Sequence, residues 1–224
     1  MAGEANSSTA SRILWGVGTS RTIRPHWALA ELSLDYETRP ILPRTGETQT
    51  PEYTRLTARQ KVPLLQDGEL TLTESAAIIS YLSETYGTDG NRLVPTKPIE
   101  RAICLEWCFF IISELDATSL YVIRRHRDLA RIYGEAPVAN DAAGVYFGRQ
   151  MRSVERALAD GRTYILGDRF GAADILLSTC VTWAVNYKVP VADAVLAYNA
   201  RATERPGFEA AVERNKPPAG MVKI

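Results

Sequence analysis

The segment that decides the fold is residues 58–75, ARQKVPLLQDGELTLTES. It contains two apolar runs, VPLLQ and ELTLT, joined across Asp67 and Gly68, a residue pair typical of hairpin turns. We therefore expect two antiparallel neighbouring strands. Pro63 stands one residue into the first run, and proline has no N–H to give to a sheet. Its position indicates an edge strand, a bulge, or a backbone turned toward something other than the sheet.

The residues before this hairpin alternate between strand and helix patterns. RILWGVG (12–18) reads as a short strand, and RPHWALAELSL (24–34) follows with apolar residues at helical spacing. Because Pro25 is tolerated only in the first turn of a helix, we expect this helix to begin at about 21–24. YETRPIL then predicts a second strand, and TPEYTRLTA predicts a short helix with Thr50 as its N-cap.

A helix at 74–87 follows the hairpin, and Gly87 is expected to end it in a left-handed conformation. The order βαβαββα over 12–87 predicts an α/β domain. After a linker at 88–98 that is rich in Gly, Pro and Asn, strand patterns vanish, and 99–224 predicts an all-α domain. The main helices expected there span about 98–125, 138–160, 172–185, 191–202 and 207–214.

The composition is that of a soluble globular protein, with 46% hydrophobic and 23% charged residues. Lys plus Arg and Asp plus Glu each number 26, so net charge gives no steering toward nucleic acid or an anionic membrane. Residues 1–11 are small and polar and do not form a secretory signal. The most apolar run, ICLEWCFFII, is too short to cross a bilayer. We expect a flexible tail at 1–11 and a cytoplasmic protein without a nucleic-acid or membrane partner.

The cysteines and histidines give no metal motif. Cys104 and Cys108 share a helix face at four-residue spacing, but no pair of further ligands is nearby, so we interpret them as core residues. With Cys180 they make an odd number, which favours reduced thiols. His26 and His126 are interpreted as surface or interface residues.

Three motifs carry a resemblance to a known family. They are SRTIRPHWALAEL at the first helix, KVP followed eleven residues later by ES, and YILGDRFGAADILL in the helical half. With these motifs, the chain resembles the cytosolic glutathione transferases over its length after the tail. The resemblance implies a thioredoxin-like N-terminal domain that binds glutathione, an all-α domain that contributes most of the second-substrate pocket, and a homodimer. Gly171 departs from the family pattern, which has Ser or Thr at that helix cap.

The resemblance also implies which residues hold glutathione. In similar proteins the Val62–Pro63 bond is cis, and Val62 turns its N–H and C=O toward the cysteinyl part of glutathione. Ser75 at a helix start would hold the γ-glutamyl carboxylate, Glu74 its ammonium group, and Lys61 the glycyl carboxylate. From the residues alone, Pro63 could equally be a trans proline at a strand entrance, Ser75 a simple N-cap, and Lys61 and Glu74 solvated charges.

Activating glutathione requires a thiolate, and a hydroxyl beside the first helix can stabilise one. The candidates are Thr19, Ser20 and Thr22; we prefer Ser20, with Thr19 second, although any of them could only cap the helix. The segment contains neither cysteine nor tyrosine, which sets the chain apart from the glutaredoxin-like and tyrosine-dependent classes. The resemblance is to a serine or threonine type, bacterial or fungal-like, with no class assigned.

For the second substrate, Tyr121 is our candidate pocket residue, with Trp183 and Tyr187 as further possibilities. RRHRD at 124–128 fits a solvated helix end, and its place could bring it near the cleft. We expect a glutathione transferase acting in detoxification. It would conjugate glutathione, as co-substrate, to small and largely apolar electrophiles, without a metal or organic cofactor. The alternatives are a glutathione-dependent peroxidase, reductase or isomerase on the same site, or a non-catalytic binding protein.

Overall fold

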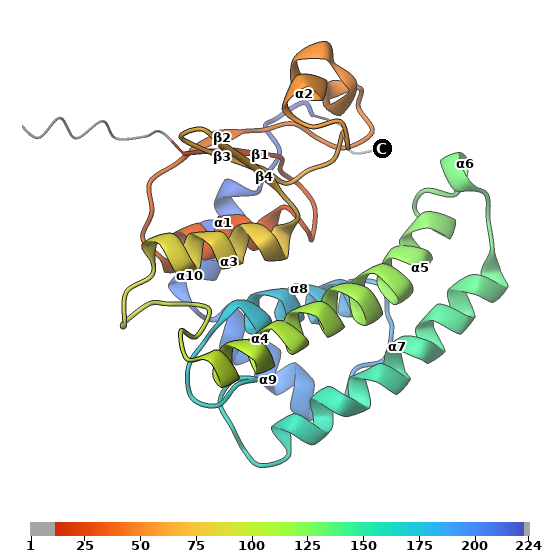
Figure 1. Cartoon of the computed structure of the whole chain (residues 1–224). Helices are drawn as coiled ribbons and strands as arrows, with labels where there is room; N and C mark the ends of the chain where they lie inside the picture. The colour runs from red at the N-terminus through yellow and green to blue at the C-terminus, as the bar shows by residue number, and fades with distance from the viewer. Residues whose placement is uncertain (1–11, 222–224) are drawn as a thin grey trace, which may run out of the picture.

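A sheet-containing half and a helical half make up the computed structural model, which describes residues 12–221 (Figure 1). The predicted tail, residues 1–11, lies outside the described residues. The first half follows the predicted order, with one additional 3-10 turn, η1. Its elements are β1 (Ile13–Trp15), α1 (Ile23–Glu31), β2 (Glu37–Arg39), η1 (Glu47–Gln49), α2 (Pro51–Leu56), β3 (Leu64–Asp67), β4 (Leu70–Thr73) and α3 (Ser75–Tyr86).

The sheet has the strand order β2-β1-β3-β4, with β1 parallel to β2 and antiparallel to β3. The predicted hairpin joins β3 and β4, but its loop lies one residue later than expected. Asp67 pairs with Leu70, so Gly68 and Glu69 form the two-residue loop, and Gly68 has a φ of 59°. Asp67 has another role, because its carboxylate accepts a 2.6 Å hydrogen bond from the Tyr86 hydroxyl on α3.

Gly87 ends α3, as predicted, but the left-handed conformation expected for it was wrong, since its φ is −70°. Its N–H donates to the Ser83 carbonyl at 3.0 Å, and the Arg92 guanidinium donates to the Ser83 and Gly87 carbonyls. A Cβ at Gly87 would lie 2.3 Å from the Ser83 carbonyl oxygen. The glycine is therefore required by a close backbone approach and not by a positive φ.

The helical half contains the predicted helices within a few residues of their expected bounds. The first of them changes to a π-helical stretch, η2, in its middle, and a four-residue helix, α6, was not predicted. The elements are α4 (Pro98–Phe110), η2 (Ile111–Leu120), α5 (Tyr121–His126), α6 (Ala130–Tyr133), α7 (Pro137–Leu158), α8 (Ala172–Asn186), α9 (Asp193–Thr203) and α10 (Pro206–Arg214).

The start of α8 explains why glycine replaces Ser or Thr at position 171. A Cβ on Gly171 would lie 2.8 Å from the Leu93 carbonyl oxygen, which accepts a hydrogen bond from the Ala172 N–H at 2.8 Å. Asp174 supplies the cap instead, because its carboxylate accepts from the Gly171 N–H at 2.8 Å and from the Tyr198 hydroxyl at 2.6 Å. The reach of Asp174 back to the cap was predicted from the sequence.

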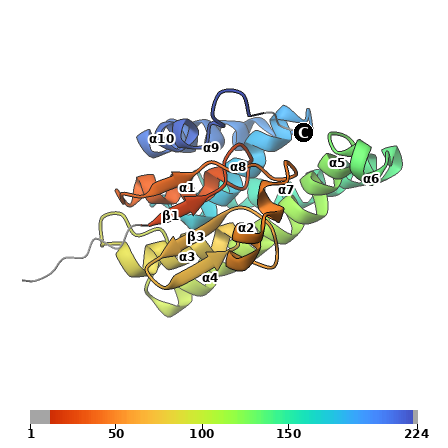
Figure 2. The ribbon, with the colours of Figure 1, turned by 90° about the horizontal axis from the view of Figure 1, so that it is seen from above.

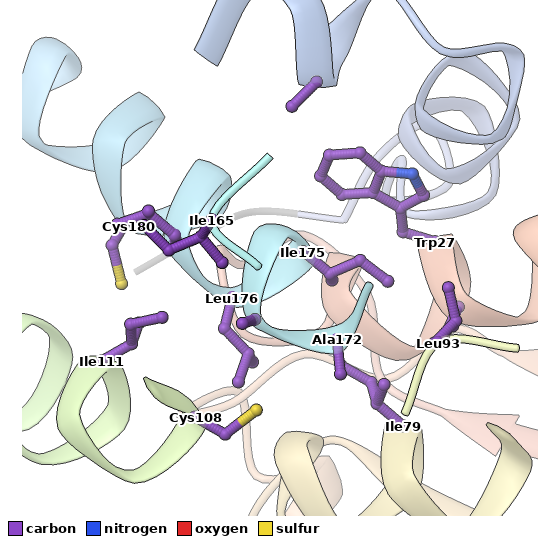
Figure 3. Packing of buried hydrophobic residues seen from close by; sticks show 14 of the residues in the cluster. Trp27, Ile79, Leu93, Cys108, Ile111, Ile165, Ala172, Ile175, Leu176 and Cys180 are labelled. Carbon is purple, nitrogen blue, oxygen red and sulfur yellow. The ribbon is translucent and has the colours of Figure 1, made fainter. Parts of the chain in front are cut away.

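The hydrophobic core lies around α8 and joins the two halves. Figure 3 shows Cys108 and Cys180 among its buried apolar side chains, and Cys104 is buried as well. All three thiols are free, so the core-packing interpretation is confirmed. At the other side, α10 lies along α1 (Figures 1 and 2), and the rings of Trp27 and Phe208 meet at a centroid distance of 4.8 Å.

The structure shows neither a membrane-spanning helix nor a metal-binding cluster within residues 12–221. No helix there is long and apolar enough to cross a bilayer. No group of three or more His, Cys, Asp or Glu side chains there could hold a metal ion.

His26 was expected at the surface or an interface, and this was wrong, because its side chain is fully buried on α1. Burial lowers the pKa of His26 to about 4, and the nearby charge of Arg214 adds to this effect. The neutral ring hydrogen-bonds to two groups. Its Nε2–H donates to the Gly16 carbonyl at 3.2 Å, and its Nδ1 accepts from the Tyr36 hydroxyl at 2.8 Å. The helical spacing placed His26 on α1 but did not show that α10 would cover that side.

The buried His26 predicts a pH-dependent stability. Between about pH 4 and 6.5 the unfolded chain binds a proton at this residue and the folded chain does not, so stability falls as the pH is lowered through this window. At pH 5 the loss from this residue should be about 2 kcal/mol relative to pH 7. Urea unfolding at both pH values should give a smaller difference for His26→Gln than for the native chain. The matched control is His126→Gln. If the free energy of unfolding changed equally between the two pH values in all three proteins, the prediction would be contradicted.

Candidate active site

A cavity of about 240 Å³ lies between the two halves of the chain. One wall comes from the β1–α1 loop and the segments on either side of α2, and the other comes from α5, α6 and α8 (Figure 1). The lining residues are Thr19, Ser20, Arg21, Pro43, Arg44, Thr48, Gln49, Arg59, Gln60, Lys61, Val62, Tyr121, Arg124, Tyr133 and Trp183.

Five of the predicted site residues line this one cavity: Thr19, Ser20, Lys61, Val62 and Tyr121. They come from both halves of the chain, so the fold brings together residues that are up to about a hundred positions apart in sequence. The remaining three, Pro63, Glu74 and Ser75, are not lining residues.

The Val62–Pro63 bond is cis, as the resemblance implied. Among the described residues, no hydrogen bond occupies the N–H or C=O of Val62. The segment is held from behind: the Tyr53 hydroxyl donates to the Lys61 carbonyl at 2.7 Å, and Gly16 lies against the Val62 side chain. A Cβ on Gly16 would be 2.5 Å from the Val62 Cβ. The unpaired amide face of Val62 is therefore fixed at the cavity wall, where an extended peptide could pair with it.

Glu74 and Ser75 form the start of α3, next to the cavity. Glu74 has a φ of 72°, an uncommon conformation for a residue with a side chain. The Arg59 guanidinium, which lines the cavity, lies 3.4 Å from the Glu74 carboxylate. The buried Ser75 hydroxyl accepts from Arg24 at 3.4 Å. The helix start can favour an anion, and it is tied to the cavity wall through Arg59.

The β1–α1 loop gives Thr19 and Ser20 different surroundings. The Thr19 hydroxyl oxygen accepts from the Thr22 N–H at 3.0 Å and also contacts the Thr22 hydroxyl at 3.0 Å. Thr19 is thus occupied by hydrogen bonds to Thr22 within the turn that precedes α1. The Ser20 hydroxyl has no hydrogen-bond partner within residues 12–221, and Ser20 lines the cavity.

Asn215, at the C-terminal end of α10, holds this loop in place. Its backbone carbonyl accepts from the Gly18 N–H at 2.8 Å, and its side-chain oxygen accepts from the Thr22 hydroxyl at 2.7 Å. Its Nδ2 donates to the Thr19 carbonyl at 3.3 Å. Sequence reasoning missed this residue, since no local pattern distinguishes Asn215 from other polar residues near the end of the chain.

Behind the loop, Asp116 on η2 pairs with two arginines of the first half. Arg24 Nη2 lies 2.7 Å from the Asp116 carboxylate, and Arg21 contacts it through both Nε and Nη2, at 3.1 and 2.5 Å. The side chains of Arg24 and Asp116 are 1% and 2% exposed. The sequence analysis missed this network, although an aspartate within a strongly apolar helix was a usable signal.

The charges in this network stabilise one another. Burial alone would raise the pKa of the Asp116 carboxyl, but Arg24 and Arg21 hold it below its usual value. Burial would likewise lower the pKa of Arg21, and Asp116 raises it above its usual value instead. The Asp116 carboxylate and the Arg21 guanidinium are therefore charged at neutral pH. The network joins α1 to η2 beside the cavity.

On the cavity wall that the helical half forms, Tyr121 interacts with cations from the first half. The Arg21 guanidinium stacks on its ring at 4.2 Å from the centroid, and Arg44 donates to its hydroxyl at 2.9 Å. Trp183 also lines the cavity, as does Arg124 from the basic run at 124–128. Tyr187 does not line it; its hydroxyl bonds to Asp128.

Two family models match the chain: the N-terminal domain of glutathione S-transferases over residues 10–84 and the C-terminal domain over 137–214. The glutathione S-transferase GstA of Escherichia coli O157:H7 is 30% identical over 165 residues, which cover 72% of this chain and 77% of that protein. The chain belongs to the glutathione S-transferase family. Its sheet of four strands followed by helices is the fold of this family, as the sequence analysis predicted.

Two further similar proteins match nearly the whole chain. A probable maleylacetoacetate isomerase of Vibrio cholerae is 29% identical over 219 residues, 93% of this chain and 99% of that protein. The theta class glutathione S-transferase of Xanthomonas axonopodis pv. citri, solved with glutathione bound, has a TM-score of 0.76 at 26% identity, covering 91% of this chain and 98% of that one.

Proposed function

We propose that this glutathione S-transferase family member binds glutathione along Val62 and activates its thiol for attack on a small electrophile. The observation that carries the proposal is the free amide face of Val62 at the cis bond to Pro63, on the wall of a cavity that Ser20 also lines. In this proposal, residues 12–87 form the glutathione-binding unit, 88–98 the linker, and 99–224 contribute the wall for the second substrate.

The tripeptide would be held at three points. Val62 pairs with the cysteinyl part, the α3 start at Ser75 and Glu74 takes the γ-glutamyl end, and Lys61 takes the glycyl carboxylate. Support comes from the contact of Arg59 with Glu74, which places the α3 start next to the cavity, and from Lys61, which is exposed on its wall. Pro63 acts through the backbone of Val62.

The chemical step requires glutathione as a thiolate. A free thiol has a pKa of about 8.5, and lowering it by about two units is worth roughly 2.7 kcal/mol. In our proposal the Ser20 hydroxyl donates to the sulfur, helped by the N-terminus of α1. Positioning of the two substrates supplies the rest of the catalysis.

The direct test is conjugation of glutathione to a chromogenic aryl chloride by the purified chain. Turnover above the rate of glutathione alone supports the proposal. Retention on immobilised glutathione without turnover would favour a non-catalytic binding protein. Faster reduction of an organic peroxide than conjugation would favour a peroxidase.

Isomerisation is the second candidate, and the near full-length match to a probable maleylacetoacetate isomerase favours it. An isomerase returns glutathione after each turnover, whereas conjugation consumes one thiol per product. Measuring free thiol alongside product formation therefore separates the two reactions.

We also propose a cytoplasmic, detoxifying homodimer. Phe109 on α4 and Val145 on α7 are 70% and 76% exposed, which is unusual for large apolar side chains. Their helices are linked between these positions: the Ser113 hydroxyl donates to the Phe109 carbonyl and contacts Glu114, which accepts from the Tyr146 hydroxyl. A second copy of the chain would cover this apolar surface.

If this surface forms the dimer interface, a charged side chain placed in it should dissociate the dimer. Phe109→Asp should convert the dimer to a monomer, because the interface would then bury a carboxylate without a partner. Light scattering after size-exclusion chromatography measures the mass directly. Ile132→Asp, at a 52% exposed apolar position on α6, is the control and should leave the dimer intact. A dimer that survives Phe109→Asp would contradict this interface.

A further inference from the structure

The cavity is strongly cationic, although the chain as a whole is neutral. Lys plus Arg and Asp plus Glu each number 26, yet no aspartate or glutamate within residues 12–221 is among the lining residues. The lining cations are Arg21, Arg44, Arg59, Lys61 and Arg124. Composition does not explain this local excess of positive charge, so it calls for anionic ligands in the cavity.

Glutathione accounts for part of this charge, and protein groups account for more. Lys61 is assigned to the glycyl carboxylate, Arg59 lies beside Glu74, and Arg21 is paired with Asp116. Two of the five lining cations are left without an assigned anionic partner. Within the described part of the chain, neither Arg44 nor Arg124 has a carboxylate within ion-pair distance.

Arg44 is held in position by an unusual turn. Its φ is 70°, a conformation that costs energy for a residue with a side chain. Glu47 maintains the turn, since its carboxylate accepts from the Leu42 N–H at 2.9 Å and from the Thr45 hydroxyl at 2.7 Å. From this turn the Arg44 guanidinium reaches across the cavity to the Tyr121 hydroxyl of the helical half. The segment at 43–50 thus places a charge at the second-substrate side.

Aromatic rings accompany the two free arginines. Tyr121, Tyr133 and Trp183 all line the cavity and all come from the helical half, as does Arg124. Aromatic faces favour flat, unsaturated ligands, and guanidinium groups favour carboxylates.

We propose that the second substrate is a planar, unsaturated electrophile that carries a carboxylate, which Arg124 and Arg44 bind. This inference rests on the proposed transferase function, and it replaces the largely apolar electrophile expected from the sequence with an anionic one. For an aryl chloride, the glutathione thiolate forms the new C–S bond at the ring carbon, and chloride leaves with the electron pair of the broken C–Cl bond.

The test compares two matched aryl chlorides, a chlorodinitrobenzoate and the corresponding chlorodinitrobenzamide. Each kcat/KM is divided by the rate with glutathione alone, which removes the difference in intrinsic reactivity. We expect the native chain to prefer the carboxylate by about tenfold or more, because a charged hydrogen bond is lost with the amide. Equal normalised values for the two substrates would overturn the inference and leave the transferase function standing.

Substitutions of the two arginines test whether these residues cause the preference for the carboxylate over the amide. Arg124→Gln and Arg44→Gln should each reduce the carboxylate-to-amide ratio severalfold, and the double variant should abolish it. Arg131→Gln is the matched control, because it removes one charge from neighbouring α6 at a residue that does not line the cavity. A ratio that survives the double variant, or that falls equally in Arg131→Gln, would overturn the assignment.

If the chain shows no turnover, the proposed transferase function is wrong, but the inference of a carboxylate-bearing ligand can still be tested by binding. Equilibrium dialysis with unreactive dinitrobenzoate and dinitrobenzamide, each in the presence of glutathione, then measures the preference directly. Tighter binding of the benzoate that is lost in the double variant would support an anion-binding acceptor site. Equal binding of the two compounds would overturn it.

Discussion

Replacing Asp116 with asparagine is expected to lower the free energy of unfolding by about 3 to 5 kcal/mol. The carboxylate lies between Arg24, which is 1% exposed, and Arg21, which is 32% exposed. Removing its charge leaves the Arg24 guanidinium buried without a counter-charge. Arg21 can turn toward the solvent, but Arg24 cannot. In a chain of this size the loss corresponds to a fall in Tm of roughly 6 to 20 °C.

Thermal and urea unfolding of Asp116→Asn measure this effect, with Asp160→Asn as the control. Asp160 pairs with Arg162 at the surface, where ion pairs contribute little, so this variant should unfold like the native chain. The double change Asp116→Leu with Arg24→Met removes the buried charges together and should recover much of the loss. A single Asp116→Asn variant as stable as the native chain would show that the network does not hold the two halves together.

The second large effect is expected on catalysis. Ser20→Ala should reduce kcat/KM for conjugation by about 25-fold at pH 7, because a rise in the pKa of bound glutathione from about 6.5 to about 8.5 lowers the thiolate population by roughly that factor. The activity should recover as the pH approaches that of free thiol ionisation, since the thiolate then forms without help. Glutathione affinity should change little, because in our proposal Val62, Ser75 and Lys61 hold the peptide.

The pKa of the bound thiol can be measured from the ultraviolet absorbance of the thiolate as a function of pH. Thr19→Ala is the matched variant, since the Thr19 hydroxyl accepts from the Thr22 N–H in the same loop. Losing this hydrogen bond should lower stability by about 0.5 to 1.5 kcal/mol, with a smaller effect on the thiol pKa than Ser20→Ala. The assignment of Ser20 would be wrong if Ser20→Ala kept its thiol pKa while Thr19→Ser retained activity that Thr19→Ala had lost.

Features that depend on neighbouring residues could be predicted from the sequence. Thr50 caps α2, where its hydroxyl accepts from the Tyr53 N–H, and Asp174 reaches back to the Gly171 N–H. Both signals lie within four residues. The hairpin was also predicted, but its loop was placed one residue early, because pairing between β3 and β4 sets the register and two apolar runs alone do not.

Features that join distant segments were missed or misjudged. Asp116 lies 92 to 95 positions from its arginines, and Asn215 lies 196 positions from Thr19. His26 was misplaced at the surface for the same reason: helical spacing shows that a residue lies on a helix but not which other helix will cover it.

By itself, the sequence determined the order of strands and helices and the family that the chain resembles, because these follow from short motifs. The resemblance in turn implied the cis bond at Pro63. Only the tertiary structure decided that Ser20 is free while Thr19 is occupied, that Asp116 joins the two halves, and that two arginines without a carboxylate partner line the same cavity as three aromatic rings. These features depend on which surfaces come into contact, and long-range packing determines those contacts.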